Sequence, residues 1–324
     1  MALLNMVEAI NLALKQEMKK DSTVMVLGED VGLNGGVFRV TDGLQKIYGE
    51  NRVVDTPLAE VGIIGSSIGL AIYGMKPIAE IQFSGFSYLG LNQLINHAAR
   101  IRFRSRGKFT CPMVVRTPYS GGIRALEHHS ESMEVLFAHT PGLKVVIPSS
   151  PYQAKGLLIS AIRDPDPVIF FESSRVYRAI KEEVPEEEYT IPIGKANIVQ
   201  EGNQLTVITW GAMLWITKKA IEQMGNKYNI ELIDLRTISP LDTETIINSV
   251  KKTGRCVIVH EAPRTFGPGA EIIAEINEKA AFDLQCPVER VTGYDVAMPF
   301  FKNEMNYLPN EKRIIMAIEK VMSS

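Results

Sequence analysis

The sequence is poor in cysteine, and the few cysteines present argue against a disulfide framework. Cys111, Cys256 and Cys286 are odd in number, and no two of them have a Cys-x-x-Cys spacing. Small secreted domains depend on paired cysteines, whereas isolated cysteines are typical of buried thiols in a reducing compartment. We therefore expect a cytoplasmic protein without structural disulfides.

Long apolar runs and an excess of one charge are also missing. No uninterrupted apolar run approaches the roughly 20 residues that a membrane-spanning helix needs. The formal net charge is −2, so the chain lacks the basic surface that binds nucleic acid or anionic lipid. The one basic run, from Arg100 to Lys108, is expected to be a solvated or partner-facing helix end. The sequence thus predicts no membrane span and no nucleic-acid partner.

Two common chemical signatures are absent as well. Gly28, Gly32 and Gly35 follow the first expected strand without the G-x-G-x-x-G spacing of a dinucleotide-binding turn, which disfavours a nicotinamide dehydrogenase. His128 and His129 are adjacent, so they point in different directions, and no metal-binding H-E-x-x-H spacing accompanies them. A single active-site histidine, able to exchange a proton near neutral pH, is the better interpretation of this pair.

The sequence does contain a regular alternation of short apolar runs and amphipathic helical patterns. This alternation is typical of a parallel α/β sheet. It is interrupted once, at 181–196, by an acidic segment with two prolines, and then resumes. We therefore predict an α/β fold of two doubly wound parallel-sheet domains, at 1–183 and 200–324, joined by a linker at 184–199.

The stretch around which the rest is organised is 53–71, VVDTPLAEVGIIGSSIGLA. A strand is expected to end at Val54, and a helical pattern follows from Leu58. Glu60 then lies in the first helical turn beyond a strand end, which is where ligands bind in open parallel sheets. An acidic residue there also complements the helix dipole, so this pattern alone leaves both interpretations open. The small residues at 62–69 indicate a close neighbour, such as a partner helix or a cofactor ring.

Several stretches together resemble one family. They are DTPLAEVGIIG, EIQFSGF, HHSES, HTPGLKVVIPSSPYQAKGLL, IDLRTISPLD and TGRCVIVHEAP. In this order, across essentially the whole chain, they resemble the β subunit of the thiamine diphosphate-dependent decarboxylating component of 2-oxo acid dehydrogenases. The resemblance implies a pyrimidine-binding first domain and a transketolase-like second domain.

The resemblance also implies partners. In that family an α subunit completes an α2β2 heterotetramer, with the active site between α and β, and holds the cofactor diphosphate through magnesium. The α subunit does so with a G-D-G pattern, which this sequence lacks. The chain is therefore expected to bind thiamine diphosphate only together with an α subunit.

Site roles follow from the resemblance position by position. Glu60 corresponds to the glutamate that hydrogen-bonds the pyrimidine ring of thiamine diphosphate. Leu58 and Gln82 correspond to residues on the pyrimidine side of the pocket, and Glu29 to a carboxylate near the cofactor. Phe86 corresponds to the ring-stacking residue, a Tyr in branched-chain enzymes, so stacking is kept and a hydroxyl is lost.

Further positions carry over in the same way. His129 corresponds to the active-site histidine, with an implied role as proton donor or stabiliser of the intermediate during reductive acylation of the lipoyl group. His128 stands where the family has Tyr and is assigned no catalytic role. Ala161, Asp164 and Asp166 correspond to a loop that holds a structural potassium ion through oxygens in relatives.

The substrate expected from the resemblance is a 2-oxo acid. The HSES, KVVIPSSP and HEAP stretches favour a branched-chain acid, with acyl transfer to lipoyl-lysine of the acyltransferase component. A pyruvate or acetoin dehydrogenase β subunit is the alternative within the family. A non-catalytic assembly subunit, in which the small-residue helix and the basic run serve only docking, is the alternative from another class.

Overall fold

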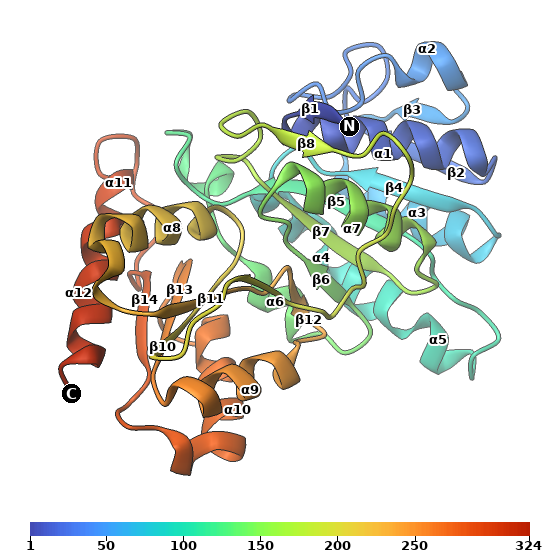
Figure 1. Ribbon diagram of the computed structural model, residues 1–324. Coiled ribbons are helices and arrows are strands. Elements are labelled where there is room, and N and C mark those ends of the chain that lie inside the picture. The colour runs from blue at the N-terminus through green and yellow to red at the C-terminus, as the bar shows by residue number, and fades with distance from the viewer.

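The computed structural model describes residues 1–324, which form two sheets with helices packed around them (Figure 1). The N-terminal half of the chain, blue to green, builds the larger sheet, and the C-terminal half, yellow to red, builds the smaller one. None of the helices has the length and apolar character needed to cross a bilayer. The predicted α/β fold with two parallel-sheet units is confirmed.

The larger sheet has seven strands in the order β12-β6-β7-β5-β4-β2-β3. Six of them are mutually parallel: β2 (Val24–Gly28), β3 (Val53–Asp55), β4 (Lys76–Glu80), β5 (Val114–Tyr119), β6 (Lys144–Val146) and β7 (Val168–Ser173). Neighbouring residues of one strand enter different cores, as Val26 and Leu27 do, and as Phe170 and Phe171 do. Both faces are therefore covered, which explains why these strands read as continuous apolar runs.

Helices of the N-terminal half cover the two faces in pairs. They are α1 (Met6–Lys20), α2 (Leu44–Tyr48), α3 (Glu60–Ile72), α4 (Ser87–Asn96), α5 (Ile101–Arg104), α6 (Glu134–Ala138) and α7 (Pro151–Arg163). The pair α1 and α7 packs in one core, and the pair α3 and α4 in the other. Helix α1 begins where it does because Asn5 and Glu8 form a capping box.

The smaller sheet repeats this design. Its order is β14-β13-β10-β11-β9, with β10 (Leu205–Thr209), β11 (Ile230–Asp234), β13 (Cys256–Pro263) and β14 (Glu289–Gly293) parallel and β9 (Asn197–Gln200) antiparallel. Its helices are α8 (Ala212–Met224), α9 (Thr243–Thr253), α10 (Pro268–Ala280), α11 (Glu304–Tyr307) and α12 (Glu311–Met322). Val207 and Ile208 again enter different cores, so this sheet is also covered on both faces.

Short strands correct the expected element boundaries. Residues Ala2–Leu4 form β1, which pairs antiparallel with β8 (Glu182–Val184), so the first helix begins only at Met6. Strand β9 pairs with β11, so residues 197–199 of the expected linker belong to the smaller sheet. Three- and four-residue strands are too short to show a period, which is why the pattern did not reveal them.

The two halves of the chain are joined by more than the segment between them. Strand β12 (Thr237–Ser239) follows β11 in sequence but pairs antiparallel with β6, at the edge of the larger sheet. Asp234, at the end of β11, accepts hydrogen bonds from the Ser149 hydroxyl at 2.9 Å and the Gln153 amide at 2.8 Å. These buried bonds fix the smaller sheet against the N-terminal half.

Candidate active site

The candidate site residues lie at one edge of the larger sheet. Strands β3, β2, β4 and β5 are neighbours and parallel, so their carboxyl ends meet at the same edge. Glu29 directly follows β2, Gln82 follows β4 by two residues, and Glu60 opens the helix after β3. The segment after β5 leads to His129. The topology therefore brings to one edge residues that are as far apart in the sequence as Glu29 and His129, which are 100 positions apart.

Glu60 is the first residue of α3, two positions later than the helix start expected at Leu58. It is 5% exposed, and its carboxylate makes no hydrogen bond or ion pair with the rest of the chain. Leu58, just outside the helix, is 65% exposed. Since the chain gives this carboxylate no partner, it is available to a ligand or a partner chain.

The charge of Glu60 acts on Glu29. Burial raises the pKa of Glu29 above its usual value, and the negative charges of Asp30 and Glu60 raise it further. Like charges near one another disfavour the ionised form of a carboxyl group. Glu29 and Glu60 therefore belong to one electrostatic environment at this edge.

An aromatic cluster surrounds the histidine pair. The ring of His129 lies 3.9 Å from that of Phe83 and 5.5 Å from that of Phe86, between centroids. The backbone of η1 (Ser84–Phe86) approaches η3 (Glu127–His129) so closely that a Cβ on Gly85 would lie 2.2 Å from the carbonyl oxygen of His128. Only glycine fits there, so the FSGF turn and the HHSES turn are held together.

The environment of His129 favours its neutral form. Burial lowers its pKa below the usual value, as does the neighbouring His128, while Glu127 acts in the opposite direction. A neutral imidazole at neutral pH can accept a proton and return it. The structure thus brings Phe86 and His129 together at the edge where Gln82, Glu29 and Glu60 also lie.

The small residues of α3 are not covered by this chain. Gly62, Ser66 and Gly69 are exposed, and a Cβ on Gly69 would meet no atom within 4 Å. The close approach between α3 and α4 uses Gly90 of α4, where a Cβ would lie 2.2 Å from Ile64. The close neighbour expected for the small residues of α3 is therefore not another part of this polypeptide.

A second ionic feature lies behind the edge and was not found in the sequence. Arg116 of β5 is 1% exposed; its guanidinium donates to Glu172 of β7 at 2.6 and 2.8 Å and also to Glu80 of β4. The Tyr177 hydroxyl donates to Glu172 at 2.6 Å. The sequence signal that could have revealed this cluster is a charged residue inside each of three otherwise apolar strands. These groups satisfy one another and so serve structure rather than ligand binding.

The carboxylates of the expected potassium loop are paired with basic side chains of this chain. Lys144 contacts both carboxylate oxygens of Asp164, at 2.8 and 2.6 Å, and Arg102 donates to Asp166 at 2.7 Å. The Ala161 carbonyl accepts from the Asp164 amide. Since side-chain cations already neutralise both carboxylates, this donor set does not favour a bound potassium ion, and the potassium site stays a prediction.

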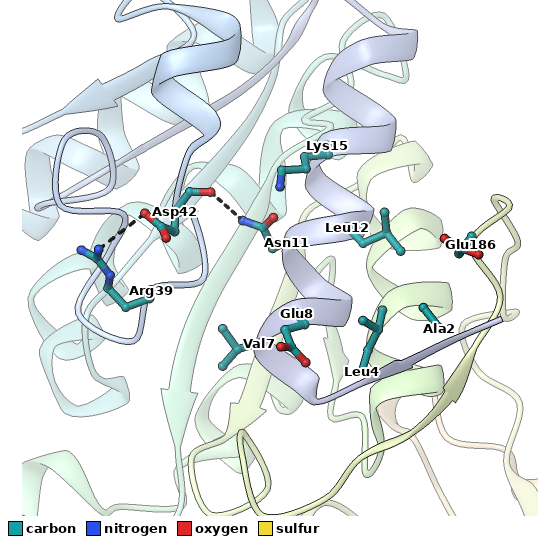
Figure 2. Close-up of a pocket in the computed structure, with 10 residues that line it drawn as sticks. All are labelled: Ala2, Leu4, Val7, Glu8, Asn11, Leu12, Lys15, Arg39, Asp42 and Glu186. Atoms are coloured by element: carbon teal, nitrogen blue, oxygen red, sulfur yellow. Dashed lines mark hydrogen bonds and ion pairs between the residues drawn. The ribbon is translucent and has the colours of Figure 1, made fainter.

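The two main cavities lie away from this edge. Figure 2 shows one of about 450 Å³ along α1, where Asn11 donates to the Asp42 carbonyl and Arg39 pairs with Asp42. A groove of about 2000 Å³ runs between α4, α5 and the C-terminal half. Of the candidate residues, only Asp166 of the expected potassium loop lines the groove, and none of the residues expected to bind the cofactor lines either cavity.

Comparisons with known proteins define the class of the two units. The transketolase pyrimidine-binding domain matches residues 3–179, and the transketolase C-terminal domain matches residues 194–314. A solved structure of a split-gene transketolase, described as an inactive β4 tetramer, superposes with a TM-score of 0.80 at 19% identity, covering 99% of both chains. That likeness concerns the fold alone. The chain has the two-domain architecture of the transketolase-like superfamily.

Full-length relatives narrow the class. The chain is 56% identical over 322 residues to the pyruvate dehydrogenase E1 component subunit beta of Acholeplasma laidlawii, covering 99% of this chain and 98% of the relative. It is 52% identical over 316 residues to the same subunit of Staphylococcus aureus strain Mu50, covering 97% of both. The chain belongs to the β subunits of the 2-oxo acid dehydrogenase decarboxylating components. The branched-chain substrate favoured by the sequence motifs is not supported, because these relatives are of the pyruvate type.

Proposed function

We propose that this chain is the β subunit of a pyruvate dehydrogenase and supplies half of a thiamine diphosphate site. The observation that carries the proposal is Glu60, a residue only 5% exposed whose carboxylate has no partner in the chain, at the carboxyl edge of a parallel sheet. A ring nitrogen that shares a proton with Glu60 would give this carboxylate the partner that the chain does not supply.

The residues at the edge fit an aminopyrimidine ring. Glu60 offers an acceptor, Phe86 a half-buried aromatic face for stacking, and Gln82 an amide that both donates and accepts. Leu58 adds exposed apolar area, and Glu29 adds a carboxyl group whose pKa burial raises above its usual value. When bound, thiamine diphosphate supplies the carbon nucleophile and the electron sink for decarboxylation. This chain's own part is to orient the ring and hold a proton at the Glu60 carboxyl.

His129 is proposed to act in acyl transfer to the lipoyl group of the acyltransferase component. Its imidazole, packed on Phe83, would give a proton to the thiolate sulfur that is released when the disulfide bond of the oxidised lipoyl group breaks, or would stabilise the intermediate of that step. His128 is tilted against Phe86, with 5.5 Å between the ring centroids, and keeps its assignment as a non-catalytic neighbour.

An α subunit is proposed to complete the site in an α2β2 heterotetramer. The chain has no G-D-G pattern for holding magnesium and diphosphate. The uncovered small-residue face of α3 begins at Glu60, so a partner that packs on this face would also reach the site. We propose pyrimidine and C-terminal domains at 1–183 and 200–324 as the two units that the α subunit meets.

Reconstitution tests the proposal. The purified chain alone should bind thiamine diphosphate weakly and show no turnover, and activity should appear on mixing with an α subunit and magnesium. In the mixed complex, pyruvate should be preferred over 2-oxoisovalerate and acetoin in kcat/KM. Full activity of the chain alone would contradict the shared site, whereas a preference for 2-oxoisovalerate would contradict only the substrate.

A further inference from the structure

The segment that carries His129 is tied to the C-terminal half of the chain. It leaves β5 at Ser120, whose amide donates to the Glu131 carbonyl at 3.1 Å and so closes the loop 120–131. The next two amides point the other way. Gly121 donates to a carboxylate oxygen of Glu261 at 3.0 Å, and Gly122 donates to Glu304 at 2.6 Å.

The two acceptors come from elements that the site itself does not use. Glu261 lies in β13 and Glu304 opens α11, and they are 5% and 1% exposed. Each carboxylate accepts the loop amide with one of its oxygens, and its other oxygen is buried without a hydrogen-bond partner. Carboxylates are strong acceptors for backbone amides, so these two bonds are of the stronger kind.

The loop backbone fits closely against its neighbours at the same place. A Cβ on Gly121 would lie 3.1 Å from side-chain atoms of both Leu308 and Met298. Gly122 has a φ of +98°, and a Cβ there would lie 2.6 Å from the Arg175 side chain. The glycine pair therefore permits an approach that brings both amides within reach of the carboxylates.

A third buried carboxylate, Glu134, has the same character. It opens α6, is 1% exposed, accepts from the Trp210 indole at 3.2 Å, and leaves one oxygen unpaired. Burial raises the pKa of both Glu134 and Glu261 to about 7, and the charges of Glu134 and Glu304 contribute to the shift of Glu261. The Gly121 amide and the charge of Arg175 act on Glu261 in the opposite direction.

We propose that Glu261 and Glu304 are positioning residues for His129, which they hold over the sheet edge by fixing the start of its loop. The proposal rests on the role given to His129 under the proposed function. The far end of the loop is held by the N-terminal half, where the Ser84 hydroxyl donates to the Glu131 carbonyl and Phe83 stacks on His129. Loss of the near end should free the loop without disturbing Glu60.

The test uses the complex reconstituted with the α subunit and the double variant Glu261→Ala, Glu304→Ala. Amide hydrogen exchange of the peptide spanning 120–132 should become about 10- to 100-fold faster, while the core strand β10 keeps its protection. Acyl transfer to a lipoyl domain should fall by about 10-fold or more, because His129 is mispositioned. Decarboxylation measured with an artificial electron acceptor should not change, because it depends on Glu60.

Matched variants separate positioning from general damage. Glu261→Gln with Glu304→Gln keeps an acceptor oxygen at both places and should restore slow exchange and acyl transfer. Glu231→Ala removes an equally buried carboxylate at the far side of the smaller sheet, where it pairs with Lys252, and should leave loop exchange unchanged. If the double alanine variant does not assemble, the single variant Glu304→Ala is judged by the same exchange measurement.

The outcomes are distinct. Unchanged exchange of 120–132 in the alanine variant, or equal loss in the alanine and glutamine variants, overturns the positioning role. A His129→Ala variant with normal acyl transfer would instead remove the proposed function of His129. In that case the exchange measurement would still decide whether Glu261 and Glu304 hold the loop.

Discussion

In both sheets, acidic side chains lie at the carboxyl ends of parallel strands, but the surroundings of these side chains differ between the two sheets. At the carboxyl edge of the larger sheet, Glu60 is buried without a partner and Glu29 has a raised pKa. At that of the smaller sheet, Asp234 accepts from Ser149 and Gln153, and Glu261 accepts from Gly121. Position at a strand end is therefore not enough to identify a site. What distinguishes the first edge is Glu60, whose carboxylate makes no bond within this chain, whereas Asp234 and Glu261 each accept at least one.

The largest effect should follow from Glu60→Gln. Its neutral amide cannot share a proton with a ring nitrogen, so kcat of the reconstituted complex should fall about 100- to 10,000-fold. The free energy of unfolding should change by less than about 1 kcal/mol, because the carboxylate makes no bond within the chain. Steady-state kinetics and denaturant unfolding measure the two quantities, with the exposed Glu50→Gln as control. Normal turnover would favour the non-catalytic assembly subunit.

Substitution in the buried ion cluster of Glu80, Arg116 and Glu172, behind the same edge, should instead lower the stability of the fold. Arg116→Met leaves Glu80 and Glu172 without their cation, and we expect a loss of about 3 to 5 kcal/mol in the free energy of unfolding. Denaturant unfolding of the chain measures the loss. Adding Glu80→Gln and Glu172→Gln should recover part of it. A loss as small as that of a surface substitution would show that the cluster is not a structural unit.

Asp234, at the edge of the smaller sheet, should affect stability and not chemistry. Asp234→Ala leaves the Ser149 hydroxyl and the Gln153 amide unpaired in a buried seam, which should cost about 2 to 3 kcal/mol. The kcat of the folded complex, measured well below its melting temperature, should stay that of the wild type. A large drop in kcat with normal stability would mean that this edge also takes part in catalysis.

The smallest effect is a pH dependence. Burial raises the pKa of Glu134 from 4.5 to about 7, so the folded chain retains a proton that the unfolded chain loses. The stabilisation is complete below the unfolded pKa and is lost as the pH rises through about 7, by at most about 1.4 kcal/mol per pH unit. Unfolding of Glu134→Gln, which has no proton to lose, should show a shallower decline between pH 5 and 7. Parallel curves for the two proteins would contradict this.

The fold was largely accessible from the sequence because both sheets are covered on both faces. Continuous apolar runs such as 168–171 are strong local signals of buried strands, and the structure has strand β7 there. The exceptions are β1, β9 and β12, whose partners lie far away in the sequence. Their positions are decided by tertiary pairing, which a local pattern does not contain.

Residues of the candidate site could be predicted from the sequence, but the contacts that hold them in place could not. Glu60 and Glu29 could be found because each follows a strand end, and the structure places them at one edge. The contacts of Gly121 with Glu261 and of Arg116 with Glu172 join residues 140 and 56 positions apart. No spacing rule links such residues, so only the three-dimensional structure reveals them.

Strand β12 has a consequence for how such a gene can be rearranged. Thr237–Ser239 completes a sheet whose other strands are all encoded upstream, beside Lys144–Val146. A gene broken between the halves would leave β6 as an open edge, and open edges promote aggregation. Recombination that exchanged one half for that of a distant relative would have to preserve the pairing between β12 and β6. The two halves are therefore expected to be inherited together.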